Sequence, residues 1–465
     1  MNRRRALQSL GLLAGAGALG RFTLLPPSRS GTLQPADALA AQLYDSLDPE
    51  QRQEACVDYD HPLRQYHNRG VWGGGLWVNP RSLGWTQRRV VTDLLYAALS
   101  EAGQERIPRE YYTRWPGVHG MKMLICGNPK SPPYQVILTG AHLNLRIGGK
   151  SREGAAFGGP LVYGDQRGNE IPGLPGNLYR FQFDAAARLL QGLTAEQQRL
   201  AMQKDSPVQT AIQLQGPEGA FPGVPISALS AANRALAREL IDGILSTYSA
   251  GDARYAWECL EHNGGPEALH FSAYADSTAG GRGAPQNFRL EGPAAVLYFR
   301  GDPHVHAFIN IGMDAGAPLS VGELLGESPA PLDGEGVARL FEAAMRDQAG
   351  VELAYYDPLS VAGRLRRGPV REGDIYALES WQDSVAVVEL QGSAMSPDMA
   401  RALRGRGLDP DPRRTYRIAT SGHVAREAMA TEGMRPSDPG SRRDGPLLRD
   451  AVIAYLKKRG FTAAG

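Results

Sequence analysis

Residues 134–147 read Tyr-Gln-Val-Ile-Leu-Thr-Gly-Ala-His-Leu-Asn-Leu-Arg-Ile, and the predicted fold is organised around them. Their β-branched and alternating apolar side chains predict a strand over residues 135–147. Side chains of a strand alternate between its two faces. One predicted face carries Ala141, Leu143, Leu145 and Ile147. The other carries Gly140, His142, Asn144 and Arg146. His142 is therefore predicted to face solvent or the floor of a cleft.

A second pair of histidines, His304 and His306, lies far downstream in a predicted β-hairpin. Its strands are residues 294–300 and 304–311, joined by a turn at residues 301–303. Both histidines fall on one face of the second strand, roughly 6–7 Å apart at the backbone. The opposite face of that strand is uniformly apolar. We expect this pair to come back and meet His142.

Three neutral imidazoles with an open position suit zinc, copper or iron. The sequence therefore predicts one transition-metal ion on His142, His304 and His306, placed to activate water or a substrate. Asp276 or Asp302 is the expected carboxylate partner, and the alternative for Asp302 is a turn residue. The alternative is that His304 and His306 are surface or hydrogen-bonding histidines on a sheet edge and that His142 lies elsewhere.

Composition excludes some functions and leaves others open. Lysine plus arginine (50) nearly cancel aspartate plus glutamate (49), and five arginines lie in the first 30 residues, so no basic face for nucleic acid is implied. The three cysteines lack the CxxC spacing of a zinc or redox site. Buried thiols are expected, with one disulfide as the alternative. Among the other histidines, we expect a structural role for His262 and His270, and solvent exposure for His119 and His423.

The N-terminus is typical of an export signal. Arg3, Arg4 and Arg5 precede a short apolar run, residues 10–19. Consecutive arginines at this position resemble a twin-arginine signal, and an ordinary secretory signal is the alternative. Residues 1–35 are thus interpreted as signal and linker, which predicts a periplasmic or secreted protein and the twin-arginine export machinery as a partner. No further run of 18 apolar residues occurs, so no membrane span is expected in the mature chain.

Periodicity predicts an α+β fold in two domains. Helices are predicted at residues 87–102, 181–190, 194–202 and 230–248, among hairpins. Capping patterns predict helix starts at Asp48 and Thr194. After residue 318 the pattern becomes alternating, with helices at 334–348 and 447–459, strands at 374–378, 385–390 and 416–420, and a loop at 435–446. We therefore expect a mixed helix and strand domain over residues 36–317 and a smaller α/β domain over residues 318–465.

Residues 40–313 resemble the bacterial family known as domain of unknown function 3500. The resemblance is carried, in order, by residues 47–52, 87–89, 99–103, 140–145 and 157–160, then by Gly292-Pro293 and by His304-Val305-His306. The chain departs from the family at three points, one of which is that the Trp-Arg expected after His-x-His is missing. Ala141 stands where the family pairs two histidines, and Tyr298 stands where it has an acidic residue.

Residues 318–465 are similar to the C-terminal domain of 5′-nucleotidases, through residues 365–376, 385–392 and 416–420. That resemblance implies a domain that holds the base and ribose of a nucleoside. Arg364 and Trp381 are then the expected substrate-binding residues, as a stacking platform for a planar ligand, although a core aromatic is the alternative for Trp381. The substrate motif Asn-x-Gly-Gly-x-Arg and the metallophosphatase domain are both absent from the sequence, so nucleotide hydrolysis does not follow.

Two functions remain open at this point. The first is an exported metal-dependent hydrolase-like enzyme that acts on a small molecule. The second is a non-catalytic extracytoplasmic ligand-binding or accessory protein whose enzyme motifs are degenerate.

Overall fold

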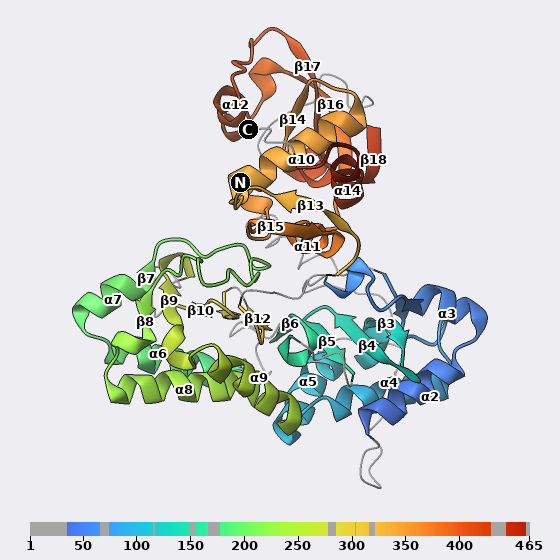
Figure 1. Ribbon diagram of the computed structural model, residues 1–465, viewed down its shortest axis with the longest axis vertical. Coiled ribbons are helices and arrows are strands. Elements are labelled where there is room, and N and C mark those ends of the chain that lie inside the picture. The colour runs from blue at the N-terminus through green and yellow to red at the C-terminus, as the bar shows by residue number, and fades with distance from the viewer. Residues whose placement is uncertain are drawn as a thin grey trace. The chain divides into compact units, whose positions relative to one another are not determined.

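The computed structural model describes residues 35–65, 74–114, 117–148, 154–165, 177–277, 285–302, 304–315, 321–428 and 443–461 (Figure 1). They belong to two compact units that meet in sequence at Val321 and Gly322, here called the N-terminal and C-terminal units. The predicted signal lies outside the described residues, as does the predicted boundary near residue 318. No described helix is long and apolar enough to cross a membrane.

Twelve strands among the described residues of the N-terminal unit form one sheet. Its main path is β1-β3-β4-β5-β6-β12-β11-β10-β9-β7, with β2 beside β3 and β8 beside β9. Neighbours are antiparallel except for β1 with β3 and β7 with β9. The strands are β1 Cys56–Val57, β2 Leu76–Trp77, β3 Lys122–Asn128, β4 Ser131–Gly140, β5 Leu143–Ile147, β6 Leu161–Asp165, β7 Met202–Gln203, β8 Val224–Pro225, β9 His270–Tyr274, β10 Asn287–Gly292, β11 Ala295–Arg300 and β12 Val305–Ile311.

Helices cover one face of this sheet, as Figure 1 shows. They are α2 Ala36–Ser46, α3 Pro49–Ala55, α4 Trp85–Ala97, α5 Glu101–Arg114, α6 Arg180–Gly192, α7 Ala195–Ala201, α8 Ala231–Leu245 and α9 Ala250–His262. Apolar residues from the strands and the helices form one large core between them. The predicted capping boxes begin helices as expected, at Asp48 for α3 and at Thr194 for α7.

The predicted strand over residues 135–147 is in fact a hairpin. Gly140 pairs with Leu143, which leaves Ala141 and His142 as a two-residue turn between β4 and β5. Gly140 therefore shares a face with Leu143, not with His142 as predicted. Residues 143–147 keep the predicted alternation, with Leu143, Leu145 and Ile147 in the apolar core.

The predicted helix over residues 87–102 is also divided. α4 ends at Ala97, and α5 begins at Glu101. Gly103, expected just beyond the helix, lies inside α5, where an added Cβ would come 1.9 Å from the carbonyl oxygen of Thr247. Glycine thus permits a close approach of two backbones that the helical pattern did not reveal.

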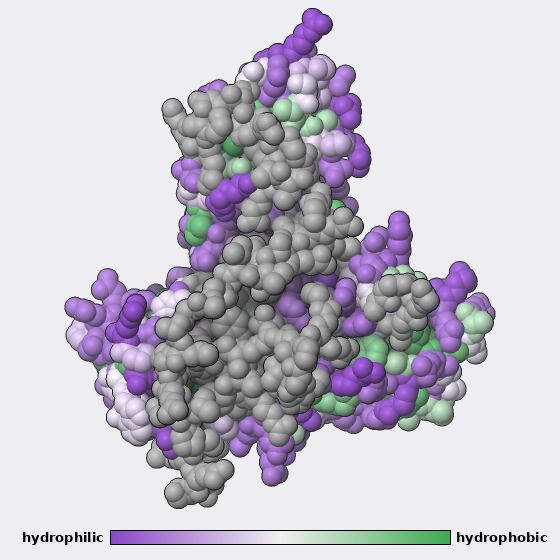
Figure 2. Space-filling view, turned by 180° about the vertical axis from the view of Figure 1, so that it is seen from behind, coloured by the Kyte–Doolittle hydropathy of each residue, from purple (hydrophilic) through white to green (hydrophobic). Residues whose placement is uncertain are grey.

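The C-terminal unit has its own cores and two smaller sheets, β14-β17-β16-β18 and β13-β15. Its strands are β13 Leu324–Ser328, β14 Leu353–Tyr355, β15 Gly368–Arg371, β16 Ser384–Gln391, β17 Thr415–Ser421 and β18 Arg443–Leu447. Its helices are α10 Gly334–Ala349, α11 Glu372–Leu378, α12 Pro397–Gly405 and α14 Leu448–Arg459. On the side seen in Figure 2, hydrophilic and hydrophobic residues are mixed over the described surface of each unit.

Two predictions for this unit are wrong. Residues 374–378 are not a strand but the end of α11, because the Asp374 carboxylate accepts a hydrogen bond from the Arg371 backbone N–H (2.7 Å) and caps the helix. β18 lies in a stretch that was expected to be a loop. Its pairing with β16 overrides the low strand propensity of Gly445 and Pro446.

Candidate metal centre

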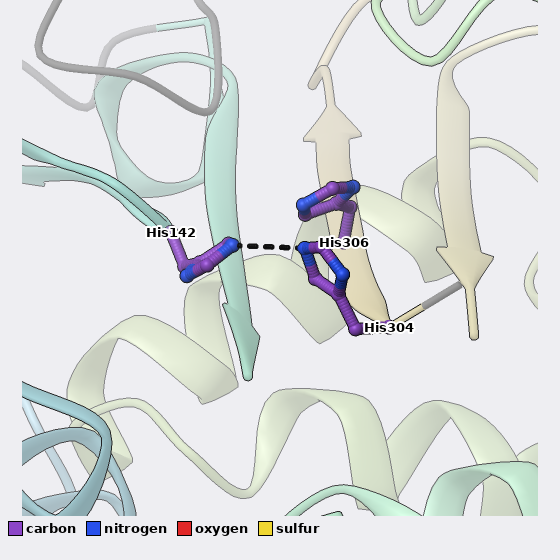
Figure 3. Close-up of side chains that lie close together, drawn as sticks. All are labelled: His142, His304 and His306. Carbon is purple, nitrogen blue, oxygen red and sulfur yellow. Dashed lines mark hydrogen bonds between the residues drawn. The ribbon is translucent and has the colours of Figure 1, made fainter. Parts of the chain in front are cut away.

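Three histidines converge at the start of β5 and the start of β12. His142 occupies the turn that leads into β5, His304 immediately precedes β12, and His306 is the second residue of β12. Their rings point toward one another in Figure 3. The structure therefore brings together the three residues that the sequence singled out.

The distances within the group are short. Nε2 of His142 lies 3.3 Å from Nε2 of His304. The ring centroids of His142 and His306 are 5.1 Å apart and nearly parallel, and those of His304 and His306 are 4.5 Å apart. One nitrogen from each ring can be chosen so that all three lie within 4.8 Å of one another.

This donor set fits a transition-metal ion. Two nitrogens bound at 2.0–2.1 Å to a tetrahedral ion lie about 3.3 Å apart, which is the separation of His142 and His304. The widest pair is about 1.5 Å longer than that, a gap that rotation of the side chains can close. His142 and His306 are buried, at 4% and 5% exposure, while His304 is half-buried. The three histidines could hold a metal ion with one side accessible.

The register of the sheet explains why the rings meet. β6 lies between β5 and β12. Gly164 of β6 pairs with His306, and its neighbour Tyr163 pairs with Leu143, so Gly164 lies between His142 and His306. An added Cβ on Gly164 would come 2.3 Å from the Val305 carbonyl oxygen and 3.3 Å from Cβ of His142. Glycine leaves the space in which the two rings face each other.

Arg300 continues the same row of cross-strand neighbours. It pairs with His306 across β11 and β12, so their side chains leave the same face of the sheet. Its side chain is half-buried. Its Nη1 makes one long hydrogen bond, 3.4 Å, to the Pro207 carbonyl, and its Nε is buried without a hydrogen-bond partner among the described residues. No described carboxylate forms an ion pair with this guanidinium.

Asn144 lies beside His142 on the polar face. It is 1% exposed, and neither its amide oxygen nor its amide nitrogen has a hydrogen-bond partner among the described residues. An unsatisfied buried polar group costs about 1–3 kcal/mol. Such a group, two residues along the strand from a candidate ligand, indicates that its partner lies outside the described residues.

A segment of residues 204–216, here called the cover segment, lies over another part of this face. Arg289 donates to the Ala211 carbonyl (2.7 Å), Asn310 to that of Ile212 (2.8 Å) and the Tyr298 hydroxyl to that of Pro207 (2.9 Å). Tyr298 thus helps to hold the cover segment in place. Burial raises the pKa of Tyr298, and the charges of Arg300 and Arg289 offset part of that rise.

The two predicted carboxylate partners have other contacts. Asp276 accepts hydrogen bonds from the backbone and the hydroxyl of Ser206, at 3.0 and 2.6 Å. The backbone N–H of Asp302 lies 3.3 Å from the side-chain oxygen of Asn287, in the turn before β12. Neither belongs to the metal-binding group of the described residues.

The remaining histidines lie apart from the group. His262 is exposed at the end of α9, and the half-buried ring of His270 packs 5.9 Å from that of Phe221. His119 and His423 are half-buried, although the sequence predicted solvent exposure. Burial, with a smaller effect of Arg88, lowers the pKa of His119. The prediction failed because short turns next to strands are packed against the core.

Arg364 and Trp381 lie in the C-terminal unit. Arg364 is exposed, and Trp381 is half-buried with its indole N–H donating to the Ser360 carbonyl at 3.0 Å. This hydrogen bond fixes the position of the indole. Stacking of a planar ligand on Arg364 and Trp381 stays a prediction.

All three cysteines are free thiols. Cys126 and Cys259 are buried and Cys56 is half-buried, so the buried-thiol interpretation holds for two of them. Burial raises the pKa of Cys126 to about 12 and that of Cys259 to about 11. Neither is a thiolate nucleophile near neutral pH.

Comparison with known proteins places the N-terminal unit. The family described as "Protein of unknown function (DUF3500)" matches residues 30–310. The chain belongs to this family. No curated protein sequence matches it at a significant level. The resemblance predicted for residues 40–313 is therefore confirmed.

Two solved nucleotidase structures are similar to the chain. A 5′-nucleotidase precursor from Thermus thermophilus is 13% identical with a TM-score of 0.29, over 81% of this chain and 79% of that chain. The NAD nucleotidase of Haemophilus influenzae is 11% identical with a TM-score of 0.26, over 42% of this chain and 55% of that chain. Scores this low carry no argument about substrate or mechanism.

Proposed function

We propose that this DUF3500 protein is an exported, metal-dependent enzyme of a hydrolase-like kind, with one transition-metal ion on His142, His304 and His306. The observation that carries the proposal is the convergence of three imidazoles from two distant segments, with the nearest nitrogens 3.3 Å apart. The arginines and the apolar run at the N-terminus support export.

A bound ion would lower the pKa of a coordinated water and polarise a substrate. Around it, each residue of the chain has a distinct part. The two buried histidines fix the inner side of the site, because their rings stack across Gly164. The half-buried His304 borders the accessible side, where substrate would enter. Three neutral ligands leave the full charge of the ion available for catalysis.

Metal analysis of the folded protein, purified without chelators, tests the proposal. We expect about one equivalent of a transition metal, lost in the double variant His304→Ala/His306→Ala and kept in His262→Ala, a control at an exposed histidine. An absence of stoichiometric metal in the wild type, or unchanged metal in the double variant, would reject the site.

The same site predicts a stability difference on metal removal. An ion present at 100 times its Kd stabilises the folded state by about 2.7 kcal/mol. A chelator should therefore lower the Tm of the wild-type protein and leave that of the double variant unchanged, which thermal unfolding can measure.

A non-catalytic ligand-binding or accessory protein is the second candidate function. It is favoured by Tyr298, which has replaced the family's acidic residue and serves to fasten Pro207. Stoichiometric metal without turnover of any ester, amide or phosphate substrate would support this alternative.

A further inference from the structure

The row of residues beside the histidines suggests what the site binds. Across β5, β6, β12 and β11 the row runs His142, Gly164, His306 and Arg300. The parallel row one step further along the strands contains Asn144, Val162, Phe308 and Tyr298. The histidine row thus ends in the guanidinium of Arg300, and the neighbouring row on the same face adds the Asn144 amide beside His142, followed by apolar and aromatic side chains.

We propose that Arg300 and Asn144 hold an anionic substrate, a carboxylate or a phosphate, against the ion of the histidine site. This inference rests on the proposed function, because the anion would bridge the ion and the two side chains. Binding of an anion requires both a positive charge and directional hydrogen bonds. Arg300 supplies the charge, and Asn144 supplies hydrogen bonds without a charge.

The charges of the described residues favour an anion. The three protein ligands are neutral when they bind a metal, so an ion of charge +2 keeps its charge. Arg300 adds a positive charge that no described carboxylate neutralises, whereas the nearby Arg289 is paired with Glu291 at 2.7 Å. Planar guanidinium groups recognise carboxylate and phosphate oxygens through paired N–H donors. Arg300 retains N–H donors for a ligand, since its one hydrogen bond to the Pro207 carbonyl is long.

The position of Arg300 suits a ligand that also contacts the ion. Directly opposed side chains on antiparallel strands have Cβ atoms about 4.5–5.5 Å apart, and His306 is the direct partner of Arg300. An arginine side chain is longer than this separation, so its guanidinium can reach a group bound beside the His306 ring.

Asn144 would act on the opposite side. Alternate residues of a strand are roughly 6–7 Å apart, which places its amide one ligand length from His142. Because both amide atoms lack a protein partner among the described residues, the N–H donors can bind an anion oxygen and the carbonyl a coordinated water. A bound ligand would thereby satisfy the buried amide that the described residues leave unsatisfied.

Cobalt-substituted protein gives a direct test, since the visible spectrum of cobalt reports what binds to it. Inorganic phosphate and acetate are titrated separately into the wild type and into Arg300→Gln, Arg300→Lys and Asn144→Leu. We expect saturable spectral changes in the wild type, at least ten-fold weaker binding in Arg300→Gln, partial rescue in Arg300→Lys and several-fold weaker binding in Asn144→Leu. Arg339→Gln, which changes an exposed arginine of the C-terminal unit, should behave like the wild type.

The outcomes separate this inference from the proposed function. If cobalt does not bind the wild type stoichiometrically, the proposed function fails and the inference fails with it. If cobalt binds but neither anion changes its spectrum, or if Arg300→Gln and Asn144→Leu bind both anions with unchanged affinity, the inference alone is overturned. Tighter binding of phosphate assigns a phosphorylated substrate, and tighter binding of acetate assigns a carboxylate. Circular dichroism of each variant shows whether it has folded. If Arg300→Gln does not fold, Asn144→Leu still tests the inference.

Discussion

Both faces of the large sheet bury side chains, but the two faces differ in how polar those side chains are. The face toward the helices is filled by aliphatic and aromatic side chains such as Leu138, Leu145 and Leu297. The other face buries Gln135, Arg146, Arg289, Glu291, His142 and His306, beside a smaller apolar and aromatic cluster. Apolar burial stabilises in proportion to area, whereas each buried polar group needs a specific partner. The first face therefore contributes most of the stability of the fold, and the second face carries the candidate site.

Breaking a partnered charge on the polar face should have the largest effect. In Arg289→Met the buried Glu291 loses the guanidinium that lies 2.7 Å away, and removing one partner of a buried pair costs about 3–5 kcal/mol. Urea unfolding should show this loss. The double variant Arg289→Met/Glu291→Leu should regain much of it, and a double variant as unstable as the single one would contradict the argument.

Truncation on the apolar face should cost a similar or slightly smaller amount. Leu297 is fully buried between strands, and Leu297→Ala should lower the free energy of unfolding by about 2–5 kcal/mol. Metal content of the folded fraction should not change, because the side chain leaves the face away from the histidines. Leu200→Ala, at an exposed leucine, serves as the control and should shift stability by less than about 0.5 kcal/mol.

In the C-terminal unit, Glu342 is a buried acid, and its ion pair with Arg406 only partly offsets the cost of burying its charge. Burial raises the pKa of Glu342 to about 7, although Tyr356 and Arg406 contact its carboxylate. With a folded pKa above the unfolded value of 4.5, Glu342 favours folding most below pH 4.5, and this contribution is lost as the pH rises to about 7. The difference is about 3 kcal/mol. Chemical unfolding between pH 4 and 8 should show this slope in the wild type and a flatter one in Glu342→Gln, and equal slopes would contradict it.

The smallest effect should come from Asn144, and its sign is the informative part. Replacing an unsatisfied buried amide with a side chain of similar size removes a desolvation cost. Asn144→Leu should therefore raise the stability of the metal-free protein by about 1 kcal/mol, measured by urea unfolding in the presence of a chelator. A clear loss of stability would show that the amide has a structural partner.

Local patterns predicted much of this molecule. The alternation along residues 143–147 and 305–311 placed the apolar residues on the core side and His306 on the other. The capping residues at Asp48 and Thr194 were also read correctly, because caps depend on a few adjacent residues.

Non-local pairing was not predictable. No signal near Gly164 or Arg300 marks either residue as a neighbour of His306, since the neighbours follow from the order β5-β6-β12-β11. The two-residue turn at Ala141 and His142 lacks the Asn-Gly type of sequence that favours tight hairpins, so the stretch looked like one long strand. The formation of β18 likewise depends on its pairing with β16, which is distant in sequence.

The separation of the histidines along the chain has a consequence for folding kinetics. His142 and His304 are 162 positions apart, and they meet only when β6 has joined β5 on one side and β12 on the other. Long loops close late, because their entropy must be overcome before their contacts form. Helix formation should therefore precede the appearance of cobalt colour in a refolding experiment, and the colour would time the moment when the two halves of the sheet unite.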